Sequence, residues 1–176
     1  MCNINDTNAR FHAVLSAYLS IVAGLCEFVM SSMAGSEEIS MSLYGITLMA
    51  TLDVTGSVLV LMRWQGSSEV QGLVEYIKEL KYSMIIGVLM VLLGLFLIVD
   101  SVMKFINEDK PTENDELGPI VAIFGFVASM ILAIYKFVVG KVLDSAVVTA
   151  DAISSLCSGF ASLAALIVVY IGITLY

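Results

Sequence analysis

Five long apolar runs divide the chain, and polar segments separate them. Their approximate bounds are residues 11–34, 41–62, 83–103, 119–138 and 143–168. An α-helix needs about 20 apolar residues to cross the hydrocarbon core of a bilayer. The last run continues toward Tyr176 but is too short for two spans, so we interpret it as one helix. The pattern therefore predicts an all-α fold: a polytopic transmembrane helical bundle of about five spans, a single transmembrane domain over residues 1–176 with no soluble domain.

Composition agrees with a membrane protein and argues against several other functions. Of the 176 residues, 59% are hydrophobic and 14% are charged, too few charges to cover a soluble domain. The formal net charge of −8 and the absence of a basic patch argue against a nucleic-acid partner. The sequence contains no His-rich cluster, Ser-His-Asp set or Gly-rich phosphate loop. We therefore expect no enzyme, no catalytic residue and no organic cofactor.

The basic residues predict the orientation of the bundle. If the N-terminus is cytoplasmic, six of the eight Lys and Arg residues fall on the cytoplasmic side: Arg10, Arg63, Lys78, Lys81, Lys136 and Lys141. The other two, Lys104 and Lys110, fall outside. An excess of Lys and Arg marks the cytoplasmic loops of membrane proteins. We therefore expect a cytoplasmic N-terminus and acidic loops that face the lumen or the exterior.

Two aspartates stand inside apolar runs. An ionised carboxylate at the centre of a membrane helix costs at least about 2.5–3.5 kcal/mol, so it usually has a cation or water beside it. Asp53 lies nine residues before Met62, and Asp151 lies eight residues after Leu143. At 1.5 Å per residue, both are roughly 12–13 Å deep. Matched depth favours a shared cation site. The alternative is that each aspartate separately hydrogen-bonds Ser or Thr hydroxyls and so holds helices together.

Neighbouring residues add candidate metal contacts. Ser154 and Ser158 follow Asp151 at i+3 and i+7, and Met49 precedes Asp53 by one turn. Hydroxyls are weak oxygen ligands that often bond to a backbone carbonyl instead. A thioether suits Cu(I) better than Zn²⁺, or simply packs. For Glu27, in the first run, two interpretations stay open: it lines an exit path, or it hydrogen-bonds Ser31.

Some of these residues resemble the cation diffusion facilitator family of zinc and manganese exporters. Leu52-Asp53-Val54 is similar to the family's second helix, and the stretch from Ser145 to Ala152 is similar to the start of its fifth. One branch, the transmembrane protein 163 type of vesicular zinc transporter, is more similar still. The stretch from Ile131 to Leu143 carries this likeness, and its core is Lys136-Phe137-Val138-Val139-Gly140-Lys141-Val142-Leu143.

The resemblance implies a six-span bundle, of which this chain would lack the last helix. It also implies ligand pairs on the second and fifth helices. Met49 stands where the family has its first acidic ligand, and Ser154 and Ser158 stand where it has its fifth-helix ligands. By the same resemblance, zinc is the transported ion, export is proton-coupled, the transporter is a homodimer, and the membrane is that of a vesicle, an endosome or the cell surface.

Two functions follow as hypotheses. The first is a divalent-cation efflux transporter in which Asp53 binds the metal, Asp151 is a ligand or charge partner, and Ser154 and Ser158 supply hydroxyls. The second is a non-transporting membrane protein that forms a heterodimer with a full-length zinc transporter and modulates it. Met49 favours the second hypothesis. Retention of both aspartates favours the first, because a helix that does not bind ions would be more stable in the membrane without an aspartate.

Overall fold

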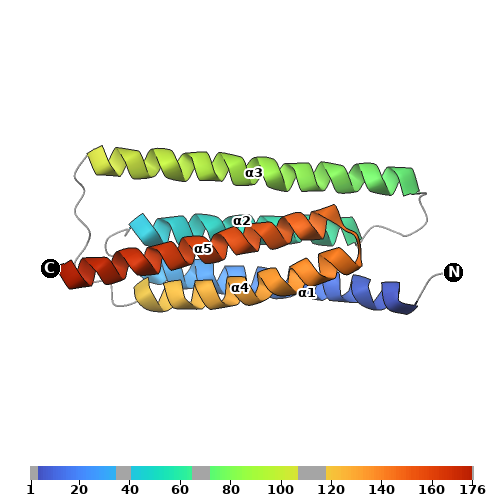
Figure 1. Cartoon of the computed structure of the whole chain (residues 1–176), viewed down its shortest axis with the longest axis horizontal. Coiled ribbons are helices and arrows are strands. Elements are labelled where there is room, and N and C mark those ends of the chain that lie inside the picture. The colour runs from blue at the N-terminus through green and yellow to red at the C-terminus, as the bar shows by residue number, and fades with distance from the viewer. Residues whose placement is uncertain (1–3, 35–40, 65–71, 107–117, 176) are drawn as a thin grey trace.

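The computed structural model describes residues 4–34, 41–64, 72–106 and 118–175 of the chain. Five α-helices fill these ranges (Figure 1): α1 (Ile4–Ala34), α2 (Met41–Trp64), α3 (Gly72–Ile106), α4 (Gly118–Val142) and α5 (Ala146–Leu175). All five are long and apolar enough to cross a membrane. The predicted all-α bundle of five spans is therefore confirmed. Consecutive helices run in opposite directions along its long axis (Figure 1).

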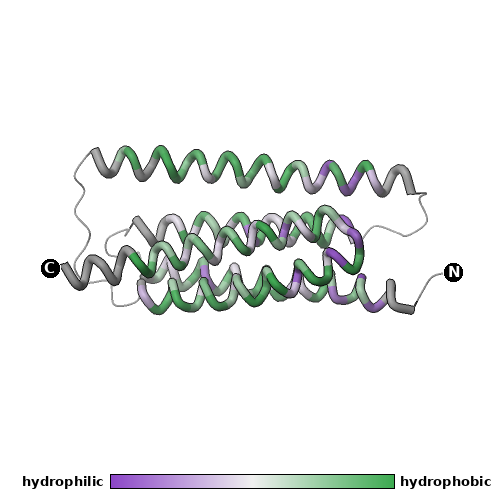
Figure 2. The backbone as a smooth tube through the Cα atoms, in the orientation of Figure 1, coloured by the Kyte–Doolittle hydropathy of each residue, from purple (hydrophilic) through white to green (hydrophobic). Residues whose placement is uncertain are grey.

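Four of the helices pack together, and the third lies to one side. Helices α1, α2, α4 and α5 form the compact group, whereas α3 contacts mainly α5 and α2 (Figure 1). Most of α3 is hydrophobic (Figure 2), and many of its large apolar side chains are exposed. Near one end of the bundle, an ion pair of 3.7 Å joins Arg63 on α2 to Glu79 on α3. Among the described residues, the buried polar and charged side chains lie on the four helices of the compact group or at the turn between α4 and α5.

A tight turn joins α4 to α5 and corrects the predicted start of the fifth span. Helix α4 ends at Val142 and α5 begins at Ala146, three residues later than expected. Asp144 adopts a positive φ of 49°, the left-handed conformation that commonly ends helices. The amide of Ser145 donates to the carbonyl of Gly140 at 2.9 Å. Asp151 thus lies only five residues inside α5.

Small residues bring the helices of this group close together. A Cβ atom on Gly140 would lie 2.8 Å from Oγ1 of Thr149, and one on Gly24 would lie 2.7 Å from a methyl carbon of Val54. These positions therefore need glycine, because a side chain would push α4 from α5 or α1 from α2. Close approach of this kind is typical of membrane helices. It leaves a narrow interior in which short polar side chains on facing helices can reach one another.

Candidate cation site

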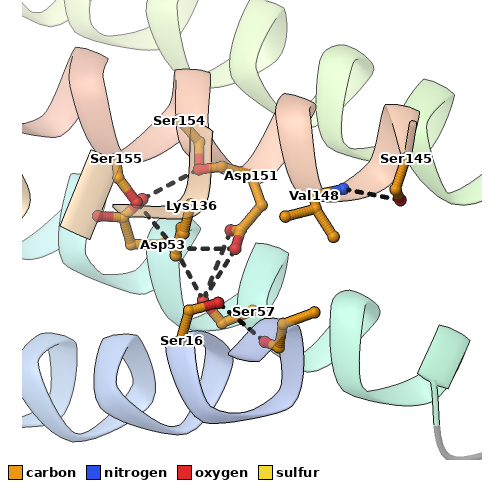
Figure 3. Close-up of polar contacts among 10 residues, drawn as sticks. Ser16, Asp53, Ser57, Lys136, Ser145, Val148, Asp151, Ser154 and Ser155 are labelled. Carbon is orange, nitrogen blue, oxygen red and sulfur yellow. Dashed lines mark hydrogen bonds and ion pairs between the residues drawn. The ribbon is translucent and has the colours of Figure 1, made fainter. Parts of the chain in front are cut away.

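Asp53 and Asp151 each face a serine across the contact between α2 and α5. The Ser154 hydroxyl donates to Oδ1 of Asp53 at 3.0 Å, and the Ser57 hydroxyl lies 3.4 and 3.5 Å from the two oxygens of Asp151 (Figure 3). The two helices are antiparallel. Asp53 therefore bonds to Ser154, which lies one turn after Asp151, and Asp151 lies against Ser57, which is one turn after Asp53. The carboxylates are consequently offset by about 6 Å along the bundle, or one helical turn. The expectation of equal depth is wrong, because α2 ends two residues later and α5 begins three residues later than predicted.

A lysine occupies the centre of this arrangement. Nζ of Lys136, on α4, lies 2.8 Å from Oδ2 of Asp151 and donates to the hydroxyls of Ser155 at 2.9 Å and Ser57 at 3.2 Å (Figure 3). An ammonium group has three N–H donors, and these three contacts use all of them. The Lys136 side chain is 0% exposed and that of Asp151 is 1% exposed. This is a fully enclosed ion pair.

The sequence analysis counted Lys136 among the basic residues of the cytoplasmic side, but its side chain is buried inside the bundle. Its Cα lies six residues before the end of α4, a position from which a lysine stem can extend to the interface. Here the stem turns into the bundle because Asp151 supplies a buried counter-charge. Without Lys136, five of the basic residues still fall on the side predicted to be cytoplasmic. The predicted orientation of the N-terminus does not depend on it.

Glycines shape the space around the ion pair. A Cβ atom on Gly56 of α2 would lie 2.6 Å from Oδ1 of Asp151, so the carboxylate fits against α2 only because that side chain is absent. Gly140 follows Lys136 by one turn on α4 and therefore lies on the same face, toward α5. The Lys-Phe-x-x-Gly spacing of the sequence thus places a cation and a close helix contact side by side.

The charges of the site do not cancel. Asp53 is 6% exposed and Asp151 is 1% exposed, and Asp53 lies close enough to interact electrostatically with both Lys136 and Asp151. With both carboxylates ionised, one ammonium would leave one negative charge in excess. Net charge in a low-dielectric interior is costly. The arrangement is therefore chemically suited to hold additional positive charge, as a proton or as a metal cation.

The other predicted site residues lie outside this contact network. Ser158 is 1% exposed, and its Oγ has no hydrogen-bond partner among the described residues. Met49 is half-buried on α2, one turn before Asp53. Within the described part of the chain, no three His, Cys, Asp or Glu side chains gather closely enough to hold a metal ion. The polar contact network therefore consists of Asp53, Asp151 and Lys136 with their serine partners.

An open groove lies beside the buried carboxylates. Its volume is about 630 Å³, and its lining includes Ser83 of α3, Lys141 of α4 and Thr149 of α5. Asp53 and Asp151 do not line it. In this conformation the groove reaches neighbouring residues of α5 while the carboxylates stay enclosed.

Comparison with known proteins identifies the family. Residues 79–176 match the model of the cation efflux transmembrane domain, and this is more than half of the chain. The chain belongs to the cation efflux family. The matched region contains Lys136, Asp151 and Ser154, whereas Asp53 lies before it. The resemblance inferred from the sequence is therefore confirmed.

A curated relative extends the likeness toward the N-terminus. Transmembrane protein 163 of Xenopus laevis is 28% identical to this chain over 152 residues. The alignment covers 86% of this chain and 53% of that protein. The chain thus spans about half the length of the curated relative that it matches.

Proposed function

We propose that this chain exports a divalent cation, with zinc as the cargo, through the group formed by α1, α2, α4 and α5. The observation that carries the proposal is the enclosed ion pair of Lys136 with Asp151, next to a second buried carboxylate at Asp53. The interior already holds one cation with a complete set of oxygen partners. A transported cation would take over the same carboxylates.

In the proposed exchange, the arriving dication displaces the ammonium of Lys136 from Asp151. Two carboxylates balance the two charges of the metal, so a second positive charge beside it would be repelled. Lys136 then releases one proton to water and becomes neutral, and the net charge of the site changes from −1 to zero. When the metal leaves, the amine takes up a proton and pairs with Asp151 again. Export is thereby coupled to proton movement in the opposite direction.

The donor atoms favour weak binding. Asp53, Asp151 and Ser154 offer oxygen atoms, and water completes the four-coordinate shell that zinc prefers. A site that is too tight would trap its ion, whereas transport requires release. Met49 and Ser158 would contribute only after a rearrangement of the helices. A homodimeric assembly and a vesicular, endosomal or plasma-membrane location complete the proposal, and both rest on the family resemblance.

Zinc flux in proteoliposomes tests this function. The full chain, Asp53→Asn and Asp144→Asn are reconstituted at equal amounts around a zinc-sensitive dye. Asp144→Asn is the matched control, because Asp144 is an exposed carboxylate at the α4–α5 turn and asparagine tolerates its positive φ. We expect flux from the wild type and the control, and the rate of protein-free liposomes from Asp53→Asn. Equal flux from all three proteins would contradict the assignment of Asp53.

One observation favours the second hypothesis, a non-transporting partner of a full-length zinc transporter. The three hydrogen bonds and ion-pair contacts of Lys136 are already complete, so the pair can serve purely to hold α4 against α5 and α2. Under this function, a folded wild-type protein gives no flux alone. Flux of a co-reconstituted cation efflux transporter would then change when this chain is added.

A further inference from the structure

A third buried carboxyl group lies in the bundle, and among the described residues it has no ion-pair partner. Glu27 on α1 is 4% exposed, and its Oε1 has no hydrogen-bond partner among the described residues. Ser31 does not serve it, because the Ser31 hydroxyl donates to the carbonyl of Phe28 at 3.1 Å. Burying a polar atom without a partner costs about 1–3 kcal/mol. Glu27 therefore differs from Asp151, which has Lys136.

Two serines on α5, Ser158 and Ser162, are each 1% exposed. The Oγ of Ser158 has no hydrogen-bond partner among the described residues, and the Ser162 hydroxyl lies close enough to interact with the Glu27 carboxyl group. Glu27 and Ser162 converge on one point of α4. A Cβ atom on Gly125 would collide with Oε1 of Glu27 and would lie 2.8 Å from Oγ of Ser162. The glycine leaves space into which a carboxylate and a hydroxyl from two different helices both project.

This group continues the line of polar side chains that begins at Asp53. Ser154, Ser158 and Ser162 recur every four residues, so they follow one face of α5. Relative to Ser154, which bonds to Asp53, they lie about 6 and 12 Å further along the helix. Glu27 and Asp53 are close enough to interact electrostatically. A buried polar path therefore runs from the Lys136 ion pair to Glu27, toward the end of the bundle at which α1 terminates.

We propose that Glu27, Ser158 and Ser162 form a second cation-binding station, which receives the divalent cation from Asp53 on its way out. This inference rests on the proposed function. One carboxylate and two hydroxyls supply only oxygen donors, which favour hard divalent cations and bind zinc weakly. Two weak binding sites in series allow the ion to move from one to the next without being held tightly at either. Glu27 and Ser162 place oxygen atoms against the same point of α4, and Ser158 lies one turn before Ser162 on α5.

Equilibrium binding and flux together test the second station. The full chain in lipid nanodiscs is titrated with radioactive zinc, and the same preparations are reconstituted for flux. Glu27→Gln keeps the size and polarity of the side chain but removes its charge. Asp144→Asn again serves as the exposed-carboxylate control. We expect about two zinc ions per chain for the wild type and the control, and about one for Glu27→Gln and for Asp53→Asn.

In the flux assay, Glu27→Gln is expected to lower the maximal rate of zinc transport. The zinc concentration that gives half the maximal rate should stay within about twofold of the wild type, because Asp53 and Asp151 are intact. Ser162→Ala provides a smaller change in case Glu27→Gln does not fold, and it should weaken only the second binding event. Two zinc ions and full flux in Glu27→Gln would overturn the station and leave the proposed function standing. A wild type that binds two zinc ions without flux would keep the station and reject transport. A wild type that neither binds nor moves zinc would reject both.

Discussion

Lys136 and Asp151 form an ion pair of 2.8 Å in which neither side chain is more than 1% exposed. The pair joins α4 to α5, and Ser57 of α2 contacts both partners. Charges enclosed in this way are costly to separate, since a lone partner stays buried without compensation. The pair therefore bears on stability and, in the proposed function, on cation binding, and the two effects can be measured separately.

Removal of one partner of this pair should be much more damaging than removal of both. We expect Lys136→Met or Asp151→Asn alone to lower the free energy of unfolding by about 3–5 kcal/mol, the range for breaking a buried pair. The double variant should lose clearly less than the sum. Unfolding in mixed micelles of increasing denaturing detergent measures all four proteins. Additive losses would show that the two side chains do not depend on each other.

The close approach of Asp151 to α2 should depend on the glycine at position 56. In Gly56→Ala the new methyl group would meet Oδ1 of Asp151 at 2.6 Å, so the carboxylate must shift away from Ser57. We expect a loss of about 1–3 kcal/mol, as for overpacking elsewhere. Gly87→Ala on α3 is the matched control, because nothing lies within 4 Å of its Cβ. Alanine should stabilise that helix by up to about 1 kcal/mol. Equal effects at the two positions would contradict the packing described here.

The two serines that the sequence assigned to the metal site should behave differently. Ser154→Ala removes the hydrogen bond to Asp53 and leaves a buried oxygen unpaired, which should cost about 1–3 kcal/mol in unfolding free energy. Ser158→Ala removes a buried hydroxyl that has no partner among the described residues, so it should leave the free energy of unfolding unchanged or raise it by up to about 1–3 kcal/mol. The same unfolding assay compares them. A larger loss in Ser158→Ala than in Ser154→Ala would mean that Ser158 is bonded in the folded state.

The five helices could be predicted because each apolar run has the length that a bilayer imposes. Asp53, Asp151 and Ser154 could be predicted to share a site because polar residues inside such runs need partners. The start of α5 could not be predicted, because Val142 and Leu143 are apolar and no Gly or Pro marks the turn. Asp144 makes that turn through its positive φ, which leaves no signature in the hydrophobic pattern.

The role of Lys136 was missed for a physical reason. A lysine near a helix end ordinarily extends its ammonium to water, and the sequence does not show which way the stem turns. That direction depends on Asp151 and Ser155 on another helix and on the serine at position 57 of α2. The direction of the Lys136 side chain is therefore defined only when the packing of α2, α4 and α5 is known. Glu27 illustrates the same limit, since its burial against Gly125 depends on the packing of α1 on α4.

The zinc affinity of Lys136→Met tests the central claim most directly, namely that the lysine ammonium occupies the place of the transported cation. Zinc binding to folded, monodisperse protein in nanodiscs would be compared among the wild type, Lys136→Met and Lys141→Met, an exposed lysine of the same helix. We predict that Lys136→Met binds zinc at least about tenfold more tightly, a gain of about 1.4 kcal/mol, and that it releases one proton fewer for each zinc bound. Lys141→Met should match the wild type. Unchanged or weaker zinc binding by Lys136→Met would contradict the claim.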